Sequence, residues 1–157
     1  DLPATGGLWS PGSAAEKKRL FIKRLAEGYT GYATWLNLQI VGLCWVTQDG
    51  DYEPGTGLHI RLREHSSYGL DLNEHPDYPG QGIGLSTVAY SLRQSQARGY
   101  KHQYSVVHSH NERMLRASVQ LLGLKKMGEI VTTRSLFGTR SVYKMREKKD
   151  DNKVLML

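Results

Sequence analysis

Apolar and polar residues alternate along several short segments of the chain, and a period of two predicts β-strands. The alternation is complete in Leu58–Arg63, so this strand should expose one of its faces. The almost wholly apolar run Ile40–Val46 indicates a largely buried strand. The predicted strands are Thr30–Leu36, Ile40–Val46, Leu58–Arg63, Tyr68–Asn73, Lys101–His108, Lys126–Leu136 and Thr139–Met145.

Apolar residues recur at helical spacing in three other segments. Residues Ala14–Glu27 place apolar side chains among lysines and arginines, and Ile83–Arg98 is followed by the stop signal Gly99. Asn111 is a good N-cap for a third helix, which should run to about Leu122. The apolar residues expected on one face of the second helix are Ile83, Leu85, Val88, Ala89 and Leu92.

The order of these elements predicts an α+β fold with three layers. Asn37–Gln39 should join the first two strands as a hairpin, although this turn lacks the preferred glycine. A right-handed crossover through the 83–98 helix places the strands at 68–75 and 101–108 side by side and parallel. We expect the rest of this mixed, twisted sheet to be antiparallel, with helices flanking it.

Composition indicates one globular domain at residues 14–146, between a Gly/Pro-rich lead-in (1–13) and a charged tail (147–157). The net charge of +6 favours an anionic ligand, but no run of basic residues alternates with aromatic ones as a nucleic-acid surface would require. No segment is long and apolar enough for a membrane span. The single cysteine, Cys44, cannot form an internal disulfide, which favours a reducing compartment, the cytoplasm.

The segment Tyr78–Gly84 carries the strongest functional signal. Its glycines lie between a predicted strand and a predicted helix, where the backbone can approach a ligand closely. The unpaired N–H groups at the start of the helix would point at the same place, and together they would form an anion cradle. A phosphate or pyrophosphate is the natural occupant of such a cradle.

Three blocks of residues around this loop resemble the GNAT (Gcn5-related) acetyltransferase superfamily, and the resemblance covers roughly residues 15–146. Their order and separation are far more specific than a lone glycine motif. The blocks are Asp71 followed by His75-Pro76-Asp77-Tyr78-Pro79-Gly80-Gln81-Gly82-Ile83-Gly84, then Ala97-Arg98-Gly99-Tyr100, then Asn111-Glu112-Arg113 with Gly123-Leu124-Lys125-Lys126-Met127-Gly128-Glu129.

The resemblance implies that acetyl-CoA binds where two central parallel strands splay apart. The loop N–H groups would bind its pyrophosphate, and the main chain of Leu72 and Glu74 would pair with the pantetheine arm. Ser86 would contact a phosphate or fill a helix-start position, and Asn111 would contact the cofactor or act as a plain N-cap. The cofactor-binding residues implied are Leu72, Asn73, Glu74, Gln81, Gly82, Ile83, Gly84, Leu85, Ser86 and Asn111.

The chain departs from the family pattern in three places. Pro79 stands where members usually carry Arg or Gln, which removes one side-chain contact to the cofactor. Ser118 or Val119 occupies the position of a tyrosine that protonates the leaving thiolate in many members. Residues 1–13 are too short for the usual first strand and helix. The first strand is therefore missing, replaced, or supplied by an upstream segment. The expected protein partner is a second copy in a homodimer or an upstream domain of the same polypeptide.

Acetyl transfer to an amine needs a general base to remove a proton from the nucleophile. Asp71 is the first candidate, because its strand should run beside the acetyl group, and Glu74 and His75 are next. The candidate proton donors to the thiolate are Tyr143, His108 and water. His108 and His110 lack the further ligands of a metal site, so we expect no metal.

The expected function is transfer of an acetyl group from acetyl-CoA to a primary amine, by direct attack without an acyl-enzyme. One alternative is an acyltransferase domain of a larger enzyme that uses another acyl-CoA or a carrier-protein thiol. The chain begins at Asp1 rather than methionine, which suits such an excised domain. The other alternative is a non-catalytic module that binds coenzyme A.

Overall fold

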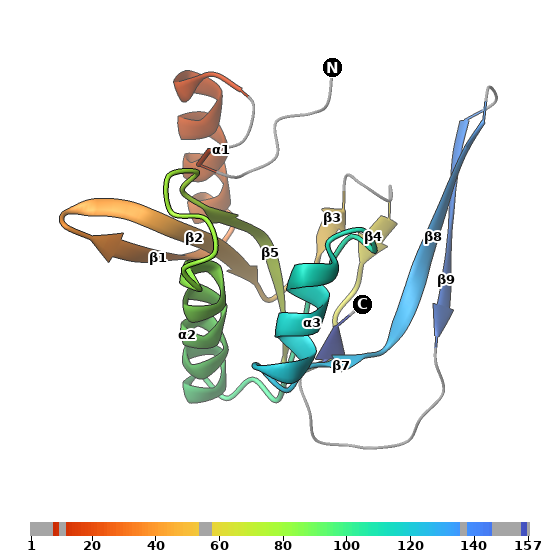
Figure 1. Cartoon of the computed structure of the whole chain (residues 1–157). Helices are drawn as coiled ribbons and strands as arrows, with labels where there is room; N and C mark the ends of the chain where they lie inside the picture. Colours follow the sequence, from red (N-terminus) through yellow and green to blue (C-terminus); the bar gives the residue numbers. More distant parts are fainter. Residues whose placement is uncertain (1–7, 10–11, 54–57, 136–137, 146–154, 157) are drawn as a thin grey trace.

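The computed structural model describes residues 8–9, 12–53, 58–135, 138–145 and 155–156 (Figure 1). Three helices and ten strands are present in this part of the chain. In chain order they are α1 (Ala14–Ala26), β1 (Thr30–Leu36), β2 (Gln39–Thr47), β3 (Asp51–Glu53), β4 (Leu58–Ile60), β5 (Ser66–Glu74), α2 (Ile83–Ala97), β6 (His102–Tyr104), α3 (Glu112–Gln120), β7 (Lys125–Lys126), β8 (Gly128–Ser135), β9 (Gly138–Met145) and β10 (Leu155–Met156).

The central sheet has the order β1-β2-β5-β6. Strand β2 pairs antiparallel with β1 and β5, whereas β5 and β6 are parallel. The connection between β5 and β6 runs through α2, as a parallel pair requires. The mixed sheet and the parallel pair confirm the predicted α+β fold class.

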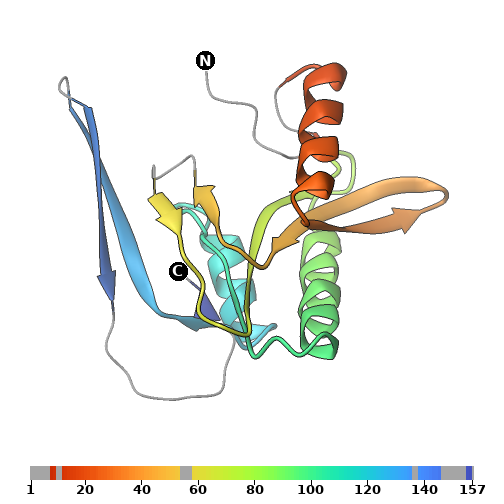
Figure 2. The ribbon, with the colours of Figure 1, turned by 180° about the vertical axis from the view of Figure 1, so that it is seen from behind.

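Helices cover both faces of this sheet, as Figures 1 and 2 show from opposite sides. Phe21 of α1 packs edge-on against Trp45 of β2. On the other face, the hydroxyl of Thr87 in α2 lies 2.6 Å from that of Thr34 in β1. The buried cluster of Tyr32, Cys44 and Val46, with Leu72 packed against it, comes from the strands of this sheet, and the ring of Tyr32 packs edge-on against that of Tyr90 in α2.

Local sequence signals explain where several elements begin and turn. Ser13 and Glu16 form a reciprocal capping box that starts α1. The β1–β2 hairpin turns through Asn37 and Leu38, at φ of 47° and 66°. Two left-handed residues match the twist of the flanking strands, so this turn forms without glycine.

Helix α2 packs on the sheet through a different face from the predicted one. Its buried residues are Gly84, Thr87, Ser91 and Ser95, while the expected apolar face is only half-buried. Small side chains at spacings of three and four residues let the helix approach the sheet closely. Their hydroxyls find internal partners, as when Ser95 donates to Gln103 Oε1 over 2.9 Å.

The predicted Leu58–Arg63 and Lys101–His108 strands are shorter in the structure, because each loses its partner. Strand β4 ends at Ile60, which pairs with the first residue of β3. Strand β6 ends at Tyr104, where its pairing with β5 stops.

The last two predicted strands form the expected antiparallel hairpin, β8–β9, but as a separate sheet. The β8–β9 hairpin stands apart from the central sheet, beyond α3 (Figure 1). The short β6 offers little edge for it to join. Strand β10, within the expected C-terminal tail (147–157), pairs with β7. The expectation about a first strand falls mostly on residues outside the described ones.

Candidate functional site

The parallel strands β5 and β6 separate soon after they begin to pair. Their register covers Ser66 to Tyr68 on β5 and His102 to Tyr104 on β6. Strand β5 then continues to Glu74, paired with β2 along its other edge. Among the described strands, none pairs with the other edge of β5 beyond Tyr68, so this edge can accept an added extended segment. The resemblance to the GNAT superfamily implied two central parallel strands that splay apart.

The glycine-rich loop follows directly from β5 and ends at the first turn of α2. Gly80 and Gly82 have φ of 76° and 75°, a backbone conformation that side chains disfavour. Gly82 is the N-cap of α2 and provides no side-chain cap, which leaves the first N–H groups of the helix to other partners. The loop therefore has the backbone of an anion cradle.

His75 fixes the start of this loop. Its N–H donates to the carbonyl of Val41 over 2.8 Å, and its Nδ1 accepts from the N–H of Asp77 over 3.2 Å. The rings of Trp9 and Tyr78 pack edge-on against the imidazole. These contacts give His75 a structural part in the loop. Its role as a base stays a prediction.

The carboxylate of Glu74 lies in the cradle. Its Oε1 accepts the N–H of Gly84 over 2.6 Å, and the side chain packs against the Cα of this glycine, where any Cβ would collide with it. Glu74 thereby caps α2 from the neighbouring strand, since a negative charge is favoured at a helix N-terminus. One of the N–H groups expected to bind pyrophosphate already has an internal acceptor.

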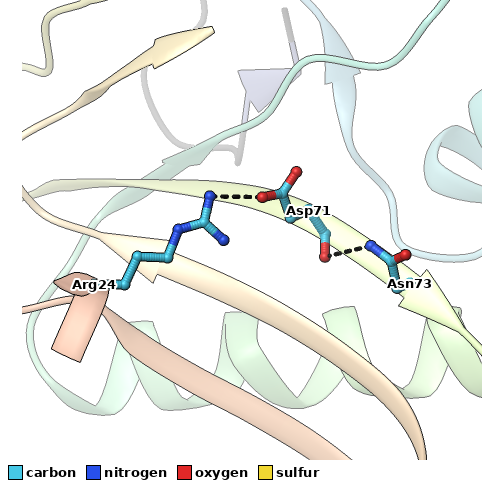
Figure 3. Close-up of polar contacts among 3 residues, drawn as sticks. All are labelled: Arg24, Asp71 and Asn73. Carbon is cyan, nitrogen blue, oxygen red and sulfur yellow. Dashed lines mark hydrogen bonds and ion pairs between the residues drawn. The ribbon is translucent and has the colours of Figure 1, made fainter. Parts of the chain in front are cut away.

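Asp71 lies in a β-bulge of β5 and pairs with a buried arginine (Figure 3). Its φ of 49° is unusual for a residue with a side chain, and such strain is often found at functional sites. Nη2 of Arg24 donates to Oδ2 of Asp71 over 2.6 Å. The side-chain amide of Asn73 donates to the main-chain oxygen of Asp71 over 3.0 Å and supports the bulge.

Sequence reasoning missed Arg24, which is only 8% exposed. Its guanidinium lies 5.4 Å from the ring centroid of Trp45 and 5.7 Å from that of Tyr29. Its buried Nη1 has no hydrogen-bond partner among the described residues. The only sequence signal was its spacing of three residues from Phe21, which places both side chains on one helix face.

Three further predicted site residues, His108, Asn111 and Tyr143, follow β6 in the chain. Asn111 caps α3 by accepting the N–H of Met114 over 3.2 Å. The rings of His108 and His110 stack at 5.2 Å on the surface, and no cluster that could hold a metal ion is present among the described residues. Tyr143 lies on β9 opposite Ile130, but its side chain is outside the described part of the structure.

The two helix positions that lack the tyrosine differ in exposure. Ser118 is fully buried, and Val119 is 47% exposed. Ser86 is exposed at the start of α2, where its hydroxyl donates to the carbonyl of Ile83 over 2.8 Å. Gln81 is exposed in the loop, while Leu85 is half-buried.

Cys44 is a buried thiol rather than an active nucleophile. Burial raises its pKa to about 11, and a hydrogen bond with Ser91 opposes part of this rise. Two aromatic residues of β1 differ in exposure, since Tyr32 is buried and Trp35 is 62% exposed. Burial also raises the pKa of Tyr32.

A polar hollow of about 830 Å³ lies at the Thr47 end of β2, away from the glycine loop. The loop is at the other end, where Gly42 pairs with Glu74. Tyr29, whose ring contacts Arg24, is in the wall of the hollow. The lining residues are Lys23, Glu27, Tyr29, Thr47, Asp49, Gly50, His59, Ile60 and Arg61.

The sequence matches no protein-family model and no curated protein. The fold is nevertheless similar to that of several acetyltransferases. An N-acetyltransferase from Staphylococcus aureus Mu50 is 13% identical with a TM-score of 0.60, over 83% of this chain and 72% of that one. The aminoglycoside N-acetyltransferase AAC(6')-Iy, bound to a CoA bisubstrate analogue, is 14% identical with a TM-score of 0.62, over 82% and 84%.

A third similar structure is a ribosomal-protein-alanine N-acetyltransferase from Brucella melitensis. It is 17% identical with a TM-score of 0.55, over 86% of this chain and 80% of that one. The chain therefore has the fold of the GNAT acetyltransferases, as its motifs predicted. No helix in the described residues is long and apolar enough to cross a membrane.

Proposed function

We propose that this protein is an acetyl-CoA-dependent N-acetyltransferase that acts on a primary amine within a ternary complex. The observation that carries the proposal is the parting of β5 and β6 beside a loop with the backbone of an anion cradle. An extended acetyl-CoA molecule would lie along the open edge of β5, with its phosphates at the loop. The similar enzyme AAC(6')-Iy has a structure with CoA bound.

In this proposal the main chain of Leu72 and Glu74 pairs with the pantetheine arm. The N–H groups from Gln81 to Leu85 bind the pyrophosphate, with Ser86 and Asn111 at the margins of the site. The carboxylate of Glu74 leaves the N–H of Gly84 when the phosphates arrive, because like charges repel at short range.

The acceptor amine must be neutral to attack the thioester carbonyl carbon. Asp71 takes its proton, directly or through one water, and Glu74 is the second candidate for this role. A carbon–nitrogen bond forms, the carbon–sulfur bond breaks, and the coenzyme A thiolate leaves with a proton from His108, Tyr143 or water. Arg24 holds the Asp71 carboxylate in place during these steps.

Incubation with acetyl-CoA and a panel of primary amines tests the proposal, with free thiol as the measured product. We expect thiol release that depends on an amine, and mass spectrometry should find the acetylated amine. Asp71→Asn should lower kcat/KM by about 100-fold, because it removes the base. Asparagine tolerates a positive φ, so the bulge should persist.

Asp77→Asn is the matched control, since Asp77 is an exposed carboxylate at the start of the glycine loop. It should keep at least half of the wild-type activity. Equal activity in Asp71→Asn and wild type would remove Asp71 from the catalytic role. Absence of acetyl-CoA binding to the wild-type protein would contradict the whole proposal.

A non-catalytic module that binds coenzyme A is the second candidate function. It is favoured by α3, which carries buried Ser118 and aliphatic Val119 where a phenol would serve as acid. Binding of acetyl-CoA without thiol release for any amine would support the module. Thiol release with longer acyl-CoA molecules, but not acetyl-CoA, would instead support the broader acyltransferase.

A further inference from the structure

The strand and loop of the proposed cofactor site contain no lysine or arginine. Between Arg63 and Arg93 the sequence contains four acidic residues and no lysine or arginine. Two of these carboxylates, Glu74 and Asp77, flank the start of the loop. A helix N-terminus contributes only about half of a positive charge, so a cation from another element would strengthen the binding of the doubly charged pyrophosphate.

Arg113 brings a guanidinium to this loop from α3. A Cβ added to Gly80 would lie 2.8 Å from Nη2 of Arg113 and 3.5 Å from Nη1. The missing side chain of Gly80 therefore makes room for the arginine. Because α3 follows β6 and the loop follows β5, Arg113 reaches across the place where the two strands part.

The surroundings of Arg113 differ from those of its neighbour on the helix. Arg116 lies 3.9 Å from the carboxylate of Glu112. Arg113 forms no ion pair within the described part of the chain and is exposed. Its guanidinium is thus held beside the loop and is accessible to a ligand.

We propose that Arg113 binds the phosphate groups of the acyl-CoA cofactor and determines the affinity of the site for phosphorylated ligands. This inference rests on the proposed function. A guanidinium can donate two parallel hydrogen bonds to one phosphate, which suits it to this role better than an ammonium group. Arg113 touches the cofactor rather than the reacting atoms, so it is a binding residue.

The test compares the binding of CoA, 3′-dephospho-CoA and pantetheine by titration calorimetry. The proteins are wild type, Arg113→Gln, Arg113→Lys and the control Arg116→Gln. Arg113→Gln should bind CoA about tenfold more weakly than wild type, and Arg113→Lys should lose less of the affinity for CoA. Pantetheine, which has no phosphate, should bind equally to all four proteins. Arg116→Gln should bind CoA as wild type does.

The three ligands also show which phosphate group of CoA Arg113 binds. An equal loss for CoA and 3′-dephospho-CoA would assign Arg113 to the pyrophosphate, and a loss for CoA alone would assign it to the 3′-phosphate. Equal CoA affinity in Arg113→Gln and wild type would overturn the inference while leaving the proposed function intact. A wild-type protein that binds none of the three ligands would overturn both. Thermal melts of each variant check that the fold is unchanged.

Discussion

Single side chains determine the electrostatics of the proposed cofactor site. The carboxylate of Glu74 accepts the N–H of Gly84, and Arg113 lies against Gly80 at the other end of the same loop. An anionic ligand would thus meet a carboxylate at one end of the cradle and a guanidinium at the other. The sequence alone identified the glycines, but it could not show which side chains surround them.

Replacing Glu74 by glutamine should tighten the binding of CoA. The amide oxygen can still accept the N–H of Gly84, but the like charge next to the incoming phosphates is gone. We expect the dissociation constant, measured by calorimetry, to fall about threefold to tenfold at low ionic strength, and less in high salt. Asp77→Asn, which neutralises an exposed carboxylate on the same loop, should have a smaller effect. Weaker binding by Glu74→Gln would show that the carboxylate helps to hold the cofactor.

At the scale of elements, α2 is the helix that positions the glycine loop. Its contact with the sheet is made by small residues, and Ser91 and Ser95 both bond with Gln103 of β6. This polar contact surface was not predicted, because a helical pattern is normally interpreted from its apolar residues. The close approach places the first turn of α2 beside Gly42 of β2, where an added Cβ would lie 2.8 Å from Ile83.

Enlarging a side chain in this contact should destabilise the fold. Ser91 is 1% exposed, so Ser91→Leu must push α2 away from the sheet. We expect the free energy of unfolding in urea to fall by about 3 kcal/mol. Gln96→Leu, at an exposed position of the same helix, should change it by less than about 0.5 kcal/mol. A small loss in Ser91→Leu would mean that the helix and sheet are packed less closely than described.

At the scale of the whole molecule, the stability should fall in alkaline solution because of Cys44. Its pKa of about 11 in the folded protein exceeds the ordinary thiol value of 9.0, so the folded state retains a proton that the unfolded state loses. The stability from this group is complete below pH 9 and is lost as the pH rises towards 11. Tyrosines and lysines also titrate there, so a comparison with Cys44→Ala is needed.

We expect wild type to lose about 2 kcal/mol more than Cys44→Ala between pH 8 and pH 10.5, as measured by urea unfolding. The alanine variant will be less stable at pH 8, and the difference between the two proteins should narrow as the pH rises. Parallel losses in both proteins would show that the thiol does not titrate with a raised pKa.

Most of the fold follows from local patterns in the sequence. The alternation in Thr30–Leu36 predicted β1 to the residue, and Asn111 predicted the start of α3. The predicted ends of strands were less accurate where pairing with another strand decides the end, as in β4 and β6. A strand ends where its hydrogen-bonding neighbour ends, and no local pattern contains that information.

The sequence by itself determined the fold class, the parallel crossover and the glycine loop, because these depend on periodicity and on residues that permit a positive φ. Only the tertiary structure brought Arg24 to Asp71, Glu74 to Gly84 and Arg113 to Gly80. These pairs are separated by up to 47 residues along the chain. Their contacts depend on how helices pack on the sheet, and the charge surrounding the proposed site is therefore a property of the folded molecule.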